Sequence, residues 1–551
     1  MSEQSKKQSF LGGAAILAGA VAVVKVIGAL YKLPLNNILG DVGKTYFQTA
    51  YEIYNVLLTV STAGLPLAIS KLTSQAHARG RENEKRKIFR TAIWLFFALG
   101  LIGSCLMFFG AQGLADFQRN SMAAAPIRAL APAVFCVCLL ACMRGYTQGQ
   151  GNMGPTAVSQ VLEALCKLGV GLPLAWYILK KTQESGNAAQ LAAVGSDGME
   201  NVAAGAIFGV TVGTILSMVF LILYLLRHRD STPSDDVPRS SGYLLRRILA
   251  IGVPITLGNC AMSIITMIDT KIILGRLQTG LGLTEVAASA LKGQYSYAMD
   301  MLNMVASFVY PVTMSLIPFA AAALAQGDKR GASRTVNSAF RILALLALPA
   351  GVGLSVLSTP IELLVLPMQR EDALAAGPHL RILGFALIFI CIMILTNAIL
   401  QTYGKERIPI FTVIAGGITK IIMNYILVGN PDINIKGAPV STLCCYMVIV
   451  GLNLFFVWKY SPQKPHYLQL FAKPVVATAL MGAAAWAVHG FVDRALSSLG
   501  VYTANAAGVL AGIAAGVVVY AVLVIALRIL RADDVRSIPK GETIIKLLHL
   551  K

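Results

Sequence analysis

A succession of long apolar stretches separated by short polar connections constrains the fold of this chain more than any other feature. Each stretch holds about 20 residues, which is enough for a helix to cross the hydrocarbon core of a bilayer. Inside a bilayer only helices and closed barrels satisfy every backbone hydrogen bond. Because 56% of the residues are hydrophobic and only 13% are charged, a water-soluble globular protein is excluded. We therefore expect an all-α polytopic membrane protein with about fourteen transmembrane helices.

The formal net charge of +20 comes from an excess of lysine and arginine. These residues gather in alternate connections, with the densest run at 71–90. Because basic connections of membrane proteins face the cytoplasm, we place both termini there. The positive charge is then an orientation signal and an attraction to anionic membrane lipids. No nucleic-acid partner is expected.

An internal repeat organises the chain. The stretch 66–90 matches 318–341, and the stretch 148–167 matches 401–420 at nearly the same spacing. Each copy would hold six helices, an even number, so both copies have the same orientation in the membrane. This predicts two pseudo-symmetric six-helix lobes facing each other across a cavity. We assign gating to the proline and Arg-Gly positions that recur in both copies: Pro66, Arg79, Gly80, Pro318, Arg330 and Gly331.

A polar segment containing serine and proline lies near the middle of the chain and is the natural boundary between the lobes. The expected parts are a first lobe at 1–230, a cytoplasmic linker at 231–243, a second lobe at 244–460, two further helices at 461–530 and a cytoplasmic tail at 531–551.

Charged side chains inside the apolar stretches indicate function. The stretch 251–275 carries Asp269 and Lys271, and each charge costs about 2.5 to 3.5 kcal/mol at the centre of a membrane helix. Two residues apart, they point to different sides and cannot neutralise each other. The full set has six basic and four acidic members: Lys25, Lys32, Glu52, Glu163, Lys167, Asp269, Lys271, Lys292, Asp300 and Lys420. The surplus of positive charge predicts a cavity for an anionic substrate such as a phosphate or pyrophosphate.

Structural interpretations of these charges remain open. Glu163 and Lys167 are four residues apart and can neutralise each other along one helix. Lys32 could extend to the outer interface, and Glu52 could form a purely structural ion pair. The fourth helix is expected to end near Arg144, in a glycine-rich turn that lacks the lysine of a nucleotide-binding loop. All nine cysteines lie in or beside apolar stretches, and we expect neither a disulfide framework nor a metal site.

Three features together carry a family resemblance: the stretch GLPLAISKL at 64–72 with the following Ala-Arg-Gly, the stretch VVKVIGALYKLPL at 23–35, and the arrangement of six, six and two helices. The chain resembles the multidrug/oligosaccharidyl-lipid/polysaccharide exporter superfamily, and within it the branch of stage V sporulation protein B and the murein-precursor (lipid II) flippases. The resemblance implies a two-lobe, alternating-access transporter in a bacterial cytoplasmic membrane. It implies transport of undecaprenyl-pyrophosphate-linked saccharides.

The resemblance also suggests roles for individual residues. Lys25 and Lys32 match first-helix basic residues that contact the pyrophosphate in the family. Some relatives bind sodium through an acidic residue of helix seven and polar residues of helix eleven, positions that Asp269 and Asn424 match. Lys420, one turn before Asn424, departs from a cation site, and we predict that it pairs with Asp269 instead. Coupling to Na⁺ or H⁺ therefore stays open.

The favoured function is a flippase for lipid II, in which no covalent bond changes, so the protein is not expected to be an enzyme. The substrate would contact Lys25, Lys32, Glu52, Lys271, Lys292 and Asp300. The alternatives are a cation-coupled drug antiporter, a flippase for another lipid-linked polysaccharide, and an enzyme acting on lipid-linked sugar; the scattered histidines argue against the enzyme. We expect no cofactor, a monomer surrounded by membrane lipids, a role in cell-wall synthesis or sporulation, and a cell-wall synthase as a candidate partner.

Overall fold

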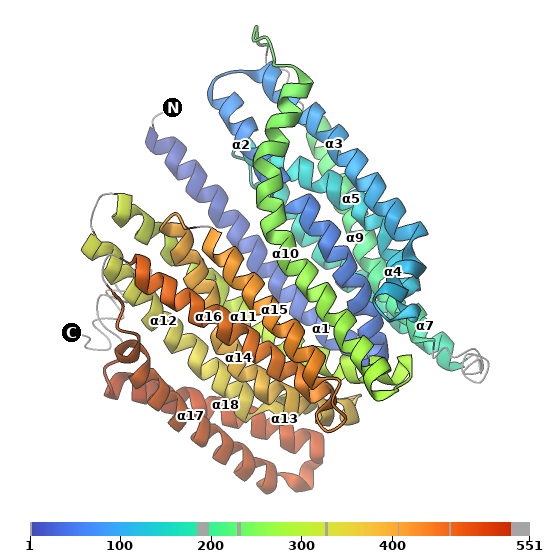
Figure 1. Ribbon diagram of the computed structural model, residues 1–551, viewed down its shortest axis with the longest axis vertical. Helices are drawn as coiled ribbons and strands as arrows, with labels where there is room; N and C mark the ends of the chain where they lie inside the picture. Colours follow the sequence, from blue (N-terminus) through green and yellow to red (C-terminus); the bar gives the residue numbers. More distant parts are fainter. Residues whose placement is uncertain are drawn as a thin grey trace. The chain divides into compact units, whose positions relative to one another are not determined.

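The computed structural model describes residues 3–184, 198–228, 233–325, 329–405, 407–461 and 464–529, with some side chains in 3–18, 258–259, 308–330, 332 and 499 left undescribed. Within these ranges the chain is almost entirely helical and contains no strand, which confirms the predicted all-α class (Figure 1). The predicted tail at 531–551 lies outside the described residues, as do the side chains of Pro318 and Arg330.

The helices follow one another with short connections. The first part of the chain forms α1 (Glu3–Thr62), α2 (Leu65–Ala78), α3 (Glu82–Phe109), α4 (Ala111–Phe117), α5 (Ala124–Gly149), α6 (Gly154–Cys166), α7 (Leu172–Glu184), α9 (Met199–Arg227) and α10 (Ser241–Leu281). The remainder forms α11 (Glu285–Ala325), α12 (Lys329–Val356), α13 (Ser358–Val365), α14 (Arg370–Thr402), α15 (Arg407–Leu427), α16 (Gly437–Tyr460), α17 (Tyr467–Ala495) and α18 (Val501–Ala526).

Eleven described helices are long and apolar enough to cross a membrane, or twelve if the bent helix α10 counts as one span. The predicted number of fourteen is thus not confirmed. Part of the difference lies in α1, which is counted once although Gly40, with a φ of 61°, breaks its helical geometry and separates two helices. Glycine adopts this backbone conformation without the steric cost that a side chain would add.

Contacts between helices divide the chain into two compact units. Unit 1 contains residues 1–278 and 283–293, and unit 2 contains residues 279–282 and 294–551. These units are defined by contacts between helices, whereas the predicted lobes are defined by the sequence repeat. The predicted lobe boundary at 231–243 therefore stays a prediction.

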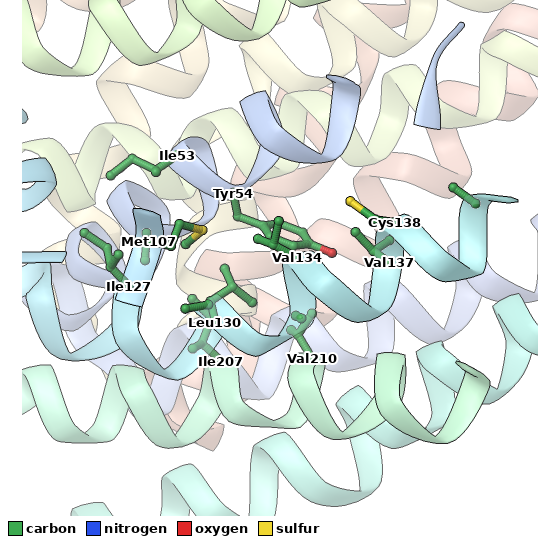
Figure 2. Close-up of a cluster of buried hydrophobic side chains, with 14 of the residues drawn as sticks. Ile53, Tyr54, Met107, Ile127, Leu130, Val134, Val137, Cys138, Ile207 and Val210 are labelled. Carbon is green, nitrogen blue, oxygen red and sulfur yellow. The ribbon is translucent and has the colours of Figure 1, made fainter. Parts of the chain in front are cut away.

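The core of unit 1 is a continuous cluster of buried side chains from α1, α2, α3, α5 and α9. In Figure 2, Tyr54 lies among aliphatic side chains such as Leu130, Val134 and Val210, and Met107 and Ile207 belong to the same cluster. Packing between helices therefore holds the unit together.

Helix α10 and the start of α11 pack against the first helices of unit 1. A methyl group at Gly64 would collide with Gly252 and Thr256 of α10, so only glycine permits this approach. Near the other end of α10, the side chain of Gln278 donates a hydrogen bond to the Arg119 carbonyl at 2.7 Å. These contacts place the charged part of α10 inside unit 1.

In unit 2, α14 packs against α12, α13 and α16, and α17 and α18 form an antiparallel pair beside α12 (Figure 1). Small residues allow the close approach: a methyl group at Gly384 of α14 would strike Ser355 and Gly351 of α12. Between α15 and α16, Thr412 donates a hydrogen bond to Asn453 at 2.8 Å. Hydrogen bonds of this kind stabilise helix contacts in a membrane.

Candidate functional site

Three of the predicted charged residues meet inside unit 1. Glu52 of α1, Asp269 of α10 and Lys292 of α11 are all buried, with exposed fractions of 4%, 3% and 5%. The carboxylate of Glu52 accepts a hydrogen bond from Gln48 at 3.2 Å and lies within electrostatic range of both Lys292 and Asp269. Buried charges in a membrane protein must be paired or reach water, and here the ammonium group of Lys292 lies near enough to Glu52 to compensate its charge.

The kink at Gly40 and the helix that follows it position this group. Lys44 is buried and donates a hydrogen bond to Asn36 at 2.8 Å, across the break in α1. The next turn continues toward Glu52, while Thr45 donates to the Ser289 carbonyl of α11 at 2.7 Å. The contact with α11 brings Lys292, one turn later, toward Glu52.

A second charged group joins α5 and α6. The Glu163 carboxylate contacts Lys167 at 3.3 Å and Arg144 at 3.4 Å, and Arg144 also donates to the Ser159 hydroxyl at 2.9 Å. These side chains are only 15% to 23% exposed. One carboxylate shared by two cations leaves a net charge of +1. The predicted pairing of Glu163 with Lys167 is thus present, and a π-helical turn begins at Lys167.

Sequence reasoning missed Arg144 as a member of this group. It expected the fourth helix to end near Arg144, whereas α5 continues to Gly149 and keeps the guanidinium inside the bundle. Gly145 enables this, because its lack of a side chain lets α5 approach the backbone of Pro66. The sequence did contain a signal, because Arg144 follows an apolar run directly and the helix could continue past it. A charged residue inside a membrane helix indicates a buried partner.

Lys25 and Lys271, two of the lysines predicted to contact the substrate, lie in different environments. Lys25 lies on an exposed face of α1 and forms no ion pair with any described residue. Lys271 lies over the ring of Phe117, with its nitrogen 3.4 Å from the ring centroid, and it too has no carboxylate partner in the described part of the chain. Cation–π contacts of this kind leave the ammonium hydrogens available to an anion. Lys32 is half-buried and has a partner within the described structure.

In unit 2 the predicted residues Asp300 and Asn424 are both buried, with exposed fractions of 7% and 0%. Lys420 is half-buried on α15. The predicted Asp269–Lys420 contact would join the two units and stays a prediction. On the same helix as Asp300, the hydroxyl of Tyr295 shares a hydrogen bond of 2.8 Å with the hydroxyl of Thr442.

Glu362 of α13 is a buried acidic residue that sequence reasoning did not single out. It is fully buried, and neither carboxylate oxygen has a hydrogen-bond partner in the described structure. Burial, reinforced by the negative charge of Asp300, raises the pKa of Glu362 to about 8. The side chain is therefore largely protonated at neutral pH. Sequence reasoning missed Glu362 because a single glutamate in an apolar stretch does not show which residues of other helices surround it.

The predicted gating residues of the first copy lie at helix ends. Pro66 stands in the first turn of α2, directly after the break between α1 and α2. Arg79 and Gly80 form the turn between α2 and α3, where Gly80 has a φ of 68°. The linker meets this turn, because Ser234 donates a hydrogen bond to the Gly80 carbonyl at 3.4 Å. In the second copy Gly331 lies in the first turn of α12. Motion at any of these positions stays a prediction.

No group of three or more histidine, cysteine, aspartate or glutamate side chains is placed to hold a metal ion in the ranges the structure describes. All nine cysteines are free thiols.

Comparison with known families agrees with this architecture. A family model described as Polysaccharide biosynthesis protein matches residues 10–323, and a MatE model matches residues 254–426. Because the first match covers more than half of the chain, the protein belongs to the polysaccharide biosynthesis protein family, within the multidrug/oligosaccharidyl-lipid/polysaccharide exporter superfamily. The resemblance seen in the sequence is confirmed at this level.

Individual relatives match most or nearly all of the chain at low identity. Three are from Bacillus subtilis (strain 168). An uncharacterized membrane protein, YabM, is 24% identical over 98% of this chain and 96% of its own. Stage V sporulation protein B is 23% identical over 97% and 98%. Lipid II flippase MurJ is 23% identical over 76% and 77%.

Two solved structures show the same fold. A lipid II flippase MurJ in an inward closed conformation superposes with a TM-score of 0.62 at 14% identity and covers 93% of this chain and 99% of its own. An inward-facing multidrug resistance MATE family transporter gives a TM-score of 0.58 at 16% identity and covers 78% of this chain and 93% of its own. The protein is therefore a polytopic membrane protein of a transporter superfamily.

Proposed function

We propose that this protein is an alternating-access flippase that moves an undecaprenyl-pyrophosphate-linked saccharide from the inner to the outer leaflet, with the peptidoglycan precursor lipid II as its substrate. The observation that carries the proposal is the surplus of cationic groups on membrane helices: among the described residues Lys25 and Lys271 have no carboxylate partner, and Arg144 and Lys167 share a single carboxylate. Cationic groups within the membrane attract phosphorylated headgroups. The likeness to a lipid II flippase over most of the chain supports the same substrate class.

The substrate contacts would be Lys25, Lys32, Lys271 and Lys292, with Glu52 and Asp300 as polar neighbours of the sugar. An ammonium group is a point charge that can follow a phosphate through different orientations. Such contacts suit a headgroup that must be bound on one side of the membrane and released on the other. No bond is made or broken in this cycle, so the protein acts as a transporter.

The membrane potential assists the return step. The outside of a bacterial membrane is positive, so it drives an unoccupied cationic site toward the cytoplasm with about 2.3 kcal/mol per charge per 100 mV. A substrate that neutralises the lysines removes this bias. The loaded and empty proteins would then favour opposite orientations, with closure at the turns that contain Arg79-Gly80 and Arg330-Gly331.

Cation-coupled drug antiport is the second candidate. It is favoured by the buried carboxylates of Glu52 and Asp269 and by the MatE match over residues 254–426. Lysines near both carboxylates argue against an additional cation: Lys292 already serves Glu52, and Lys420 is predicted to serve Asp269. Net positive charge would also repel cationic drugs.

We also propose a bacterial cytoplasmic membrane location with both termini in the cytoplasm, where lipid-linked precursors are made. A cell-wall synthase at the outer face and a role in sporulation or vegetative growth belong to the same proposal.

Complementation tests the proposal directly. In a bacterium depleted of its own lipid II flippase, the parent chain should restore growth and normal cell shape. Lys25→Ala and Lys271→Ala should each reduce rescue, because one anchor for the pyrophosphate is lost, and the double variant should abolish it. Lys25→Arg should retain rescue, since the charge is kept.

Lys180→Ala is the matched control, because Lys180 is an exposed helix lysine paired with Glu184 at 3.5 Å. It should rescue as the parent does, at equal abundance in the membrane. Failure of the parent would reject lipid II as substrate. Full rescue by the Lys25/Lys271 double variant would reject those lysines as binding residues.

A further inference from the structure

A groove of about 1840 Å³ opens on the surface of unit 1 between the ends of α3, α5, α9 and α10. Its polar end contains three cationic side chains from the first three turns of α3, namely Arg86, Lys87 and Arg90, and no acidic side chain of a described residue lines it. Lys87 and Arg90 form no ion pair with any described residue. The groove therefore presents cationic groups that are not neutralised by the protein.

The chemistry of the groove changes along α3. One turn beyond Arg90, the lining becomes apolar and aromatic, with Ile93, Trp94 and Leu95. Trp94 contacts Phe97 edge-on, with ring centroids 5.9 Å apart, and still leaves 68% of its surface exposed. A second hollow of about 520 Å³ shares Gly242 and Leu245 with the groove and runs along α10 to Pro254, lined almost wholly by apolar residues. Cationic groups at one end and apolar walls beyond them match the shape of a lipid.

The internal repeat shows what covers the same surface elsewhere. Phe89 and Arg90 of α3 correspond to Phe340 and Arg341 of α12. In unit 2, Phe340 packs edge-on against Tyr467 and Phe471 of α17, with ring centroids 5.5 and 6.3 Å apart. The equivalent surface of α12 is thus covered by a helix of the protein, as Figure 1 shows for α17 beside α12.

In unit 1, Phe89 contacts Tyr146 of the neighbouring α5, with ring centroids 4.4 Å apart, and both rings line the open groove. An apolar surface of this size in a membrane protein is filled by acyl chains. The cations beside it then select the headgroup.

We infer that this groove is a binding site for an anionic phospholipid, with the phosphate against Lys87 and Arg90 and the acyl chains along Trp94 and α10. The site is separate from the residues assigned to transport and does not depend on the identity of the transported substrate. Each of the two free cations should favour an anionic over a zwitterionic lipid about fivefold, because a basic side chain near an anionic headgroup contributes about 1 kcal/mol.

Fluorescence of Trp94 tests the inference in the full-length chain. The other three tryptophans are replaced (Trp176→Phe, Trp458→Phe, Trp486→Phe), and the protein is reconstituted into phosphatidylcholine vesicles that contain one-fifth phosphatidylglycerol. Brominated acyl chains, which quench tryptophan on contact, are placed on only one of the two lipids. Brominated phosphatidylglycerol should quench Trp94 far more than its share of the bilayer predicts.

Lys87→Ala with Arg90→Ala should lower that quenching to the share of phosphatidylglycerol in the bilayer. The control variant, Lys71→Ala with Lys459→Ala, removes two exposed cations outside the groove and should leave the preference unchanged. Monodisperse gel filtration of each variant shows that the fold is retained. Quenching in proportion to bilayer composition in the parent, or a preference that survives loss of Lys87 and Arg90, would overturn the inference.

Discussion

Glu163 illustrates how a single carboxylate can hold two cations within a helical bundle. It contacts Arg144 and Lys167 together, so its removal leaves two positive charges side by side with little water. Removing one member of such a group destabilises the fold more than replacing all of its members by uncharged residues, because the charges that remain are left unpaired.

Glu163→Ala is therefore expected to destabilise the protein more than Lys167→Ala, which still leaves one pair intact. Partial exposure of the group reduces the cost to about 1 to 3 kcal/mol, below the range for fully buried pairs. Thermal unfolding in detergent, followed by circular dichroism, measures the difference. The double variant Glu163→Ala/Lys167→Ala should recover part of the loss; a larger loss than in Glu163→Ala would contradict this explanation.

Glu362 gives a prediction about pH. Its pKa is about 8 in the folded protein against an ordinary value of 4.5, so folding takes up a proton. Stability should therefore be full below about pH 4.5, fall as pH rises toward about 8 and level off above that value. Glu362→Gln keeps a neutral side chain of similar shape and should remove this fall.

The melting temperatures of the parent and Glu362→Gln should agree at the acidic end and separate toward pH 8, with the variant higher. Glu371→Gln, in the first turn of α14, is the matched control and should follow the parent at every pH. Parallel curves for parent and Glu362→Gln would show that the carboxyl is not held neutral by its surroundings.

At the scale of an element, the start of α3 is capped by a residue from far along the chain. The carboxylate of Asp236, in the linker, accepts hydrogen bonds from the backbone N–H groups of Asn83 and Glu84, both at 2.9 Å. Desolvation opposes ionisation, but the hydrogen bonds from Ser234 and these two N–H groups hold the pKa of Asp236 below its ordinary value. The cap is thus charged at neutral pH, where it also favours the positive end of the helix dipole.

Asp236→Ala should cost about 1 kcal/mol, as for other lost helix caps, and should free the linker from the turn that contains Gly80. Limited proteolysis at the arginines of this region should become faster than in the parent. Asp235→Ala, the neighbouring exposed residue, is the control. Equal cleavage rates in Asp236→Ala and the parent would mean that other contacts hold the linker in place.

The elements also show where sequence reasoning succeeds. Hydrophobic runs place α3, α5, α9 and α14, because a membrane requires long apolar helices whatever their partners. The boundary at Gly40 and the extension of α5 beyond Arg144 were not predictable, since both depend on which helix packs alongside.

At the scale of the whole molecule, the charges on the membrane helices were found in advance, whereas their pairing was not. The free-energy cost of a charge inside a membrane helix marks Glu52, Asp269 and Lys292 as exceptional. Their proximity in the structure, however, depends on how α1, α10 and α11 pack together. Glu362 was missed because its significance rests on the absence of a partner. The groove beside Trp94 was missed for the same reason, as no pattern in one helix reveals which neighbour is lacking.

The contrast between Phe340 and Phe89 has a consequence for how this protein responds to its surroundings. Phe340 is buried against α17 of the same polypeptide, whereas Phe89, although it contacts Tyr146, lines an open groove that we infer is filled by lipid. A change in growth conditions that alters the headgroup composition of the membrane would leave the surface around Phe340 unchanged. It would change which lipids cover the surface around Phe89. Two copies of one ancestral unit would thereby acquire different sensitivities, one encoded in the gene and the other set by metabolism.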